Sequence, residues 1–154
     1  RNFTKTDSLH HFGQLHAPVA EIIALTPEKR ILHNDIIDLK PLRQLAYGKV
    51  LLMGDAAHAM PPNMGQGACQ GIEDAVILQQ LIRQYPTDLS EVFQKFEAVR
   101  LPRTTTIVNR SFTLGKIAQA SQPWLIALRN ALFRLMPARM NNRQLDFIMD
   151  MNAA

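Results

Sequence analysis

Residues 50–75 carry the stretch V-L-L-M-G-D-A-A-H-A-M-P-P-N-M-G-Q-G-A-C-Q-G-I-E-D-A, and the rest of the chain is arranged around it. Its apolar start, 50–53, predicts a short strand covered on both faces, and Gly54-Asp55 predicts the turn that ends the strand. The apolar spacing over 66–83 predicts a helix after the turn. Ligands bind open α/β sheets just past the carboxyl ends of the strands. Asp55 is therefore a candidate ligand contact.

Two glycines stand where the predicted helix begins. Gly65 and Gly67 each cost about 0.5–1 kcal/mol relative to alanine if their backbone is helical. A helix N-terminus presents unpaired N–H groups and a partial positive charge, so a start without side chains lets an anionic or polarised ligand lie against the backbone. The preceding Pro61-Pro62 stiffens the approach. A turn without a ligand is the alternative, but Asp55 and the glycines together favour a binding site.

The glycine spacing excludes two common phosphate-binding patterns. Glycines at 65, 67 and 71 are one residue too long for G-x-G-x-x-G, and no G-x-x-x-x-G-K occurs. The stretch instead resembles the G-D motif of the FAD-dependent aromatic hydroxylases, which are single-component flavoprotein monooxygenases. The family signature runs G-D-A-A-H, Pro, G-Q-G and E-D-A. Its elements stand here at 54–58, Pro62, 65–67 and 73–75.

Other segments extend this resemblance over most of the chain. Residues 35–42, D-I-I-D-L-K-P-L, are similar to a D-I-Y-D-L-K-P-L segment that precedes the G-D strand in the family. Residues 96–103, F-E-A-V-R-L-P-R, are similar to an aromatic-E-x-x-R-x-P-R segment. Leu45 departs from the pattern, because the family often has an aromatic residue there. The departure bears on the substrate and not on the cofactor.

The resemblance implies that FAD is the cofactor and that this chain supplies the flavin-facing half of its site. Asp55 would accept a hydrogen bond from the ribityl chain, and backbone N–H groups would face the pyrimidine edge of the isoalloxazine. NAD(P)H would reduce the flavin, and a flavin hydroperoxide would hydroxylate a small aromatic or heteroaromatic substrate beside the Pro62 backbone. No side chain of the chain is expected to be a catalytic nucleophile. The implied cofactor-binding residues are Gly54, Asp55, Pro62, Gly65, Gln66, Gly67 and Ala68.

The expected fold is mostly α-helical with a few short β-strands, as the C-terminal fragment of the α/β FAD-binding fold of the aromatic hydroxylases. We expect a remnant of the substrate-domain edge with a connecting strand at 1–49, the strand–loop–helix of the FAD-binding domain at 50–83, and a C-terminal helical region at 84–154.

Five elements are expected outside the central stretch. Pro18 should break the first helix, D-L-S-E at 88–91 is a capping-box pattern, and Pro102 should bend the long helix without ending it. The elements are a helix over 9–25, a strand over 31–39, a loop over 41–48, a long helix from 89 through 118, and a helix that starts at Pro123.

Composition indicates one globular unit, since 154 residues with 47% hydrophobic and 19% charged side chains can form a modest core. No apolar run approaches the roughly 18 residues of a membrane span, and no secretory signal is recognised, so a cytoplasmic location is expected. The start at Arg1 suggests a cut or processed product. The single Cys69 has no partner for a disulfide and is expected in the core.

No metal site is expected, although three histidines lie near the N-terminus. No cysteine or closely spaced carboxylate completes a set of ligands with them or with Asp55 and His58. Glu73 and Asp74 are neighbours on a helix and point about 100° apart, so they are interpreted as structural and not as an acid–base pair. The histidines are His10, His11 and His16.

The stretch 98–145 contains eight Lys or Arg residues and no Asp or Glu. With the apolar residues of 124–136, this charge could mark a helix at a membrane surface, and nucleic-acid binding is less favoured because the basic residues are dispersed. The favoured interpretation is that the arginines face an acidic region elsewhere in a longer protein or attract the phosphates of NADPH and FAD. Neither a membrane nor a nucleic acid is an expected partner.

Two alternatives remain open from the sequence. One is another flavin oxidoreductase with the G-D motif, such as a reductase or a halogenase. The other is a non-enzymatic basic helical module that binds a membrane surface or a partner. For the isolated chain we expect no activity, no bound FAD and self-association, because the strand 50–53 and the small-residue stripe of the following helix would lack their packing partners.

Overall fold

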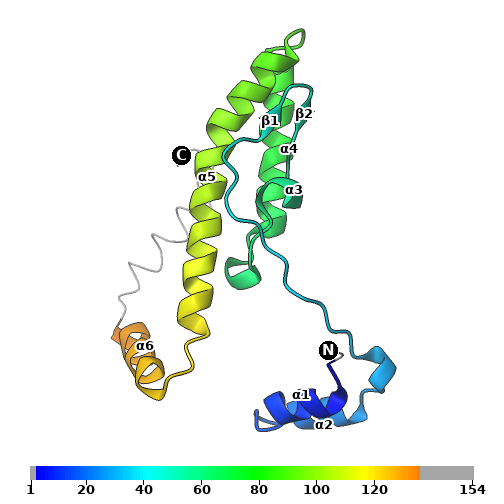
Figure 1. Ribbon diagram of the computed structural model, residues 1–154, viewed down its shortest axis with the longest axis vertical. Coiled ribbons are helices and arrows are strands. Elements are labelled where there is room, and N and C mark those ends of the chain that lie inside the picture. The colour runs from blue at the N-terminus through cyan, green and yellow to red at the C-terminus, as the bar shows by residue number, and fades with distance from the viewer. Residues whose placement is uncertain (1–2, 136–154) are drawn as a thin grey trace. The chain divides into compact units, whose positions relative to one another are not determined.

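The computed structural model describes residues 3–135, and the contacts between residues divide the chain into two units between Ile36 and Ile37. Helices dominate both units, and the strands of the described residues are short (Figure 1). The predicted helical character is therefore confirmed. In this described part no helix is both long and apolar enough to cross a membrane.

The first unit contains α1 (Lys5–Phe12), α2 (Val19–Leu25) and the short 3-10 helix η1 (Glu28–Arg30). A reciprocal cap fixes the start of α1, because the Thr4 hydroxyl accepts the Asp7 N–H and the Asp7 carboxylate accepts the Thr4 N–H. The two predicted helical pieces are present and α2 begins directly after Pro18, but α1 already ends at Phe12, before the proline. The helix nevertheless starts four residues before the predicted position 9.

The strand predicted over 31–39 is wrong, since none of these residues is in a strand. A strand needs a neighbour that exchanges backbone hydrogen bonds with it. Here Leu39 donates one N–H to the Ala59 carbonyl at 2.9 Å, and no ladder continues from this contact. Ile36 and Ile37 remain exposed. The apolar residues of 31–39 suggested a strand, but the sequence of this segment does not show whether a neighbouring strand is present to pair with it.

The second unit begins with a hairpin of β1 (Ala46–Tyr47) and β2 (Val50–Leu51), which pair antiparallel around a turn at Gly48. β2 is two residues shorter than predicted, and β1 lies inside the predicted loop 41–48. The expected burial on both faces is also wrong in this chain, because Val50 is 57% exposed. The two-stranded sheet offers no further layer that could cover it.

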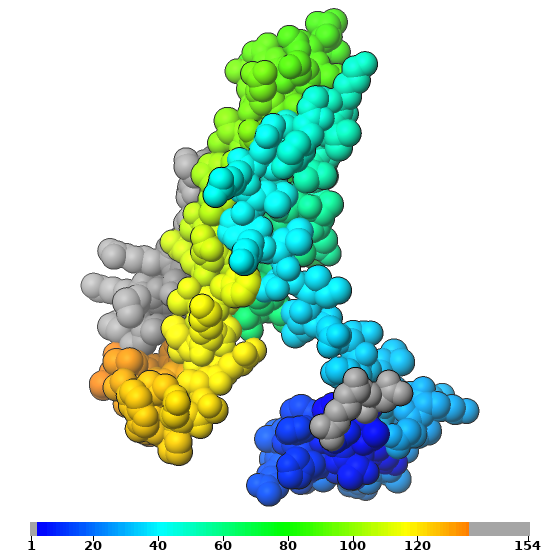
Figure 2. All heavy atoms as spheres, viewed as in Figure 1, coloured from blue at the N-terminus to red at the C-terminus, as the bar shows by residue number. Residues whose placement is uncertain are grey.

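Up to residue 135, five helical segments follow the hairpin, and the two longest, α4 and α5, pack side by side (Figure 1). Figure 2 shows the hairpin segment lying across these helices, where the Glu97 carboxylate of α5 accepts the backbone N–H groups of Leu45 and Ala46. Leu45, Ala57 and Phe96 form the centre of the core. The segments are α3 (Asp55–His58), η2 (Pro62–Met64), α4 (Gly67–Gln84), α5 (Leu89–Ala118) and α6 (Pro123–Leu135).

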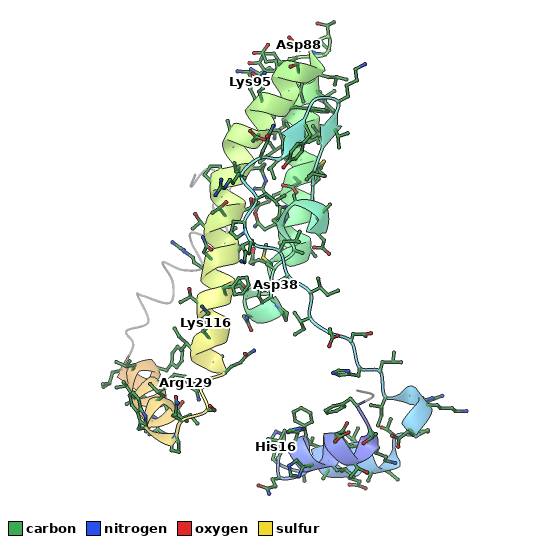
Figure 3. The ribbon with its side chains drawn as sticks, viewed as in Figure 1. His16, Asp38, Asp88, Lys95, Lys116 and Arg129 are labelled. Atoms are coloured by element: carbon green, nitrogen blue, oxygen red, sulfur yellow. The ribbon has the colours of Figure 1, made fainter. Side chains whose placement is uncertain are left out.

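The long helix was predicted correctly. The Asp88 side chain accepts the Glu91 N–H at 2.9 Å and caps α5, which continues through Pro102 without a break. α6 begins at Pro123 as predicted. Arg129 of α6, labelled in Figure 3, donates to the Ala118 carbonyl at 2.7 Å and so satisfies the C-terminal end of α5.

Candidate functional site

The Gly-Asp turn is built on a backbone conformation that favours glycine. Gly54 has φ +54°, and its carbonyl accepts the N–H groups of Ala57 and His58 at 2.9 Å each. These bonds wind residues 55–58 into the single turn α3, which the sequence analysis did not predict. Asp55 is the first residue of α3, and its exposed carboxylate has no hydrogen-bond partner among the described residues. It is free to accept a hydrogen bond from a ligand.

The two glycines expected at the helix start differ from each other. Gly65 has φ +64° and ends η2 in the left-handed conformation, so it lies outside α4 and carries no helical penalty. Gly67 is the first residue of α4, and a Cβ there would meet nothing within 4 Å. Neither backbone strain nor packing within the described chain therefore requires a glycine at 67. The N-cap, Gln66, makes no side-chain cap hydrogen bond, so the first N–H groups of α4 stay available.

The G-D turn lies directly against α4. A Cβ on Gly71 would stand 3.8 Å from the Gly54 Cα, a close but ordinary contact. Further along α4 the Asp74 carboxylate accepts the Gly54 N–H at 2.8 Å. The same Oδ2 lies 2.7 Å from His58 Nε2, which donates because the carboxylate can only accept. Asp74 thus holds both ends of the turn that presents Asp55.

Two arginines of α5 complete a buried charged cluster with the acids of α4. Arg100, fully buried, donates from Nε to Asp74 at 2.6 Å and from Nη1 to Glu73 at 2.7 Å. Arg103 donates from Nε to Glu73 at 2.7 Å. Gln70 accepts from Arg100 through its side chain and its backbone. The adjacent acids therefore meet different nitrogens of one guanidinium group, and two positive charges offset two negative ones.

The cluster keeps both carboxylates ionised. Burial raises the pKa of Asp74, but hydrogen bonds from His58, the Gly54 N–H and Arg100 outweigh it, and the pKa lies below its ordinary value. Burial likewise raises the pKa of Glu73, and Arg103 and Arg100 more than compensate. In the described residues, His58 Nδ1 is the buried side-chain polar atom without a partner.

Sequence reasoning missed this pairing. It assigned the arginines of the acid-free stretch to acidic regions outside the chain or to cofactor phosphates, whereas Arg100 and Arg103 bind the chain's own Glu73 and Asp74. A partial signal was present, since R-x-P-R at 100–103 repeats a positive charge at the i,i+3 spacing of one helix face, and E-D at 73–74 places two negative charges on another helix. The expected burial of Cys69 is wrong as well, because it lies on the exposed face of α4.

The side chains that the structure describes form no metal centre. No group of three or more His, Cys, Asp or Glu side chains within residues 3–135 could hold a metal ion. The chemistry of the G-D region is instead that of an organic ligand site. It combines an unpartnered carboxylate at Asp55 with open backbone N–H groups after Gly65 and Gly67.

β2, which ends at Leu51, is followed by the Gly54-Asp55 turn and by the glycine-lined start of α4, an order that is typical of a cofactor-binding strand–turn–helix unit. Residues 28–111 match the model of a family described as FAD binding domain. The chain belongs to this family, and FAD is its cofactor, as the resemblance implied. The residues present fit that group, because Asp55 can accept hydroxyl hydrogen bonds and the open position of Gly67 leaves room for a planar ring.

Several relatives are similar over most of this chain. It is 39% identical to aurachin C monooxygenase/isomerase of Stigmatella aurantiaca over 86% of its length, and 38% identical to a 2-heptyl-3-hydroxy-4(1H)-quinolone synthase of Pseudomonas aeruginosa over 82%. These matches cover 34% and 33% of the relatives. The chain therefore spans about a third of the proteins it resembles.

Solved structures give the same fold. Klebsiella pneumoniae HpxO complexed with FAD and uric acid superposes with a TM-score of 0.81 at 29% identity, covering 94% of this chain and 37% of HpxO. A salicylate hydroxylase substrate complex gives a TM-score of 0.70 at 27% identity, covering 97% and 36%. The predicted class, a fragment of an aromatic-hydroxylase FAD-binding fold, is confirmed.

Proposed function

We propose that the whole protein is an FAD- and NAD(P)H-dependent monooxygenase that hydroxylates a small aromatic or heteroaromatic substrate. The aurachin C monooxygenase/isomerase and the salicylate hydroxylase named above support this, as does the complex of HpxO with FAD and uric acid. The observation that carries the proposal is the G-D region itself. In this region Asp55 has no hydrogen-bond partner among the described residues, and packing does not explain why residue 67 is glycine. A bound flavin would explain both observations.

Each site residue has a defined task in this proposal. Asp55 accepts a hydrogen bond from the ribityl chain, a charge-assisted contact worth about 1.5–3 kcal/mol when buried. The N–H groups of Gly67 and Ala68, at the positive end of α4, face the pyrimidine edge of the isoalloxazine, where they favour negative charge. The backbone at Pro62 lines the space for the substrate. When bound, the flavin supplies electron transfer from NAD(P)H and the activation of dioxygen.

The division of labour along the chain is part of the proposal. Residues 50–83 form the flavin-facing strand–loop–helix, and residues 1–49 belong to the edge of a substrate domain and its connection. Residues 84–154 form the C-terminal region, whose described part, 84–135, is helical and supports the flavin-facing unit, while 136–154 lie outside the described residues. The relatives are about three times as long, which leaves room for the part that binds the ADP half of FAD.

The test is Asp55→Ala in the full-length protein. We expect the fold to be retained and the FAD occupancy after dialysis to fall by at least about tenfold, which corresponds to the loss of a charge-assisted hydrogen bond. Glu21→Ala is the matched control, because Glu21 is an exposed carboxylate of α2 in the other unit. Unchanged FAD retention in Asp55→Ala would refute the assignment of Asp55.

A second measurement separates a monooxygenase from a flavin reductase or halogenase. We expect aromatic probes such as salicylate or uric acid to stimulate NADPH oxidation, with dioxygen consumed and either hydroxylated product or hydrogen peroxide released. Oxidation that requires halide or a separate electron acceptor, and that no aromatic probe stimulates, would favour one of the alternatives.

A further inference from the structure

We propose that Ser111 and Gly115 of α5, together with Asn63 of η2, are positioning residues that fix the Pro61–Pro62 segment beside the flavin. The inference rests on the proposed function, because that function places the Pro62 backbone at the substrate side of the cofactor. We call the three residues the proline clamp. It is separate from the Asp74 cluster, which holds the G-D turn at the other end of the same loop.

Ser111 makes the first contact of the proline clamp. Its Oγ donates to the Pro61 carbonyl at 2.6 Å, across fifty positions of sequence, and the side chain is fully buried. Because the residue after Pro61 is another proline, the local backbone supplies few N–H donors for this carbonyl. α5 therefore supplies the donor, and the Ser111 hydroxyl sets the direction in which the Pro61–Pro62 peptide faces.

Asn63 makes the reciprocal contact. Its Nδ2 donates to the Ser111 backbone carbonyl at 3.0 Å. The loop and α5 thus exchange two hydrogen bonds, one from each side, around the single residue Ser111. One bond would let the proline segment rotate about the contact, whereas two bonds fix its position and its orientation. Contacts between η2 and α5 surround the pair.

Gly115 completes the proline clamp because glycine, which has no side chain, leaves room for the Asn63 amide. A Cβ at this position would lie 2.3 Å from Asn63 Nδ2 and 3.1 Å from its Cγ. Gly115 is buried in the last turn of α5, its φ is not positive, and a helical glycine is less stable than alanine, so backbone conformation does not require it. Close approach of the Asn63 amide is the physical reason for glycine here. An alanine would force the amide to rotate and to leave the Ser111 carbonyl.

The proline clamp gives α5 a role in the geometry of the site as well as in the core. Asp74 fixes Gly54 and His58 from α4, and Ser111 fixes Pro61 from α5. The loop between these anchors can therefore hold one shape before the flavin binds, which reduces the ordering cost at that moment. Changes at the proline clamp should alter the surroundings of the flavin ring more than they alter the affinity for FAD.

The experiment uses the full-length protein with bound FAD and compares Ser111→Ala, Asn63→Ala, Gly115→Ala and the double variant Asn63→Ala/Gly115→Ala. The readouts are the dissociation constant for FAD and the visible circular dichroism of the bound flavin. Thr113→Ala is the matched control, because Thr113 lies on the exposed face of α5 and its hydroxyl donates only to the Asn109 carbonyl.

We expect FAD affinity to fall by about tenfold at most, the value of one neutral hydrogen bond. The visible dichroism bands should shift in Ser111→Ala, Asn63→Ala and Gly115→Ala and stay in place in Thr113→Ala. In the double variant the dichroism should match Asn63→Ala alone, since the added Cβ then has no amide to displace. Ser111→Ala and Asn63→Ala only remove atoms, so they carry the test if Gly115→Ala does not fold.

Flavin dichroism that is unchanged in Ser111→Ala and Asn63→Ala, with FAD bound, would overturn the proline clamp and leave the proposed function standing. An equal shift in Thr113→Ala, or an added effect of Gly115→Ala in the Asn63→Ala background, would also overturn it. A full-length wild-type protein that binds no FAD would instead overturn the proposed function, and with it any role of these residues beside a flavin.

Discussion

The first turn of α4 and its middle differ in whether their polar groups have partners within the protein. In the middle, Asp74 is buried and Glu73 is partly buried, and each carboxylate is bound by arginine. At the start, Gly67 and Ala68 face open space without a cap. In the middle of α4 the charged side chains are hydrogen-bonded to protein partners, whereas at its start the backbone N–H groups are available to a ligand. We expect changes in the middle of α4 to affect the stability of the fold, and changes in its first turn to affect the binding of FAD.

The largest expected effect is on stability, from Arg100→Met. The change leaves the buried Asp74 carboxylate without its guanidinium partner, while Glu73 keeps Arg103, and it should lower the free energy of unfolding by about 3–5 kcal/mol. Lys95→Met is the control, because the Lys95–Glu91 pair (Lys95 is labelled in Figure 3) spans 3.4 Å with both side chains more than 40% exposed. That variant should lose much less stability, because solvent screens an exposed ion pair. Urea unfolding measures both, and equal losses would show that burial does not distinguish the two pairs.

A smaller effect should appear on acidification. Both cluster carboxylates have a lowered pKa in the folded state, so the unfolded state binds more protons as the pH falls. Their stabilisation is present at neutral pH and is lost as the pH falls below about 5 toward the lowered pKa values. In Asp74→Asn, this acid limb of the stability curve should be shallower, and stability at pH 7 should be lower by about 1–3 kcal/mol. Melting temperatures between pH 3 and pH 7 measure the slope, and an unchanged slope would contradict the assignment.

At the open end, Gly67→Val should act on the cofactor alone. The branched side chain enters space that is empty in this chain, and valine is no worse than glycine in a helix, so stability should hold or rise. In the full-length protein, FAD affinity should fall by about tenfold or more, as expected for about 1–3 kcal/mol of overpacking. Ala98→Val, at an exposed position of α5, is the control. Normal FAD binding by a more stable Gly67→Val protein would mean that the glycines serve turn geometry only.

The same contrast explains what the sequence could predict. The capping pattern at 88–91, the continuation through Pro102 and the helix start at Pro123 depend on nearby residues, and they were predicted correctly. The strand at 31–39 and the hairpin depend on which segment lies alongside, and this information is not local. The contact between Asp74 and Arg100 spans 26 positions, and the one between Pro61 and Ser111 spans 50. The G-D motif identified the cofactor, while the residues that hold the motif in place needed the structure.

The smallest effect, a weak association, is expected when the 154-residue chain is made alone. Val50 of the hairpin is 57% exposed and Ile72 of α4 is 66% exposed, so apolar side chains of an edge strand and of a helix face meet solvent. Such surfaces favour contact with a second copy. We therefore expect a dimer or higher oligomer. We also expect no bound FAD, because this chain offers only the flavin-facing half of the site. The contacts to the ADP half are then lost, and each 1.4 kcal/mol of lost binding free energy weakens the affinity about tenfold. Light scattering after size exclusion gives the mass, and an absorbance scan detects flavin. Ile72→Glu should shift the chain toward monomer, and a yellow wild-type monomer would show that the open end of α4 needs no further part of the protein.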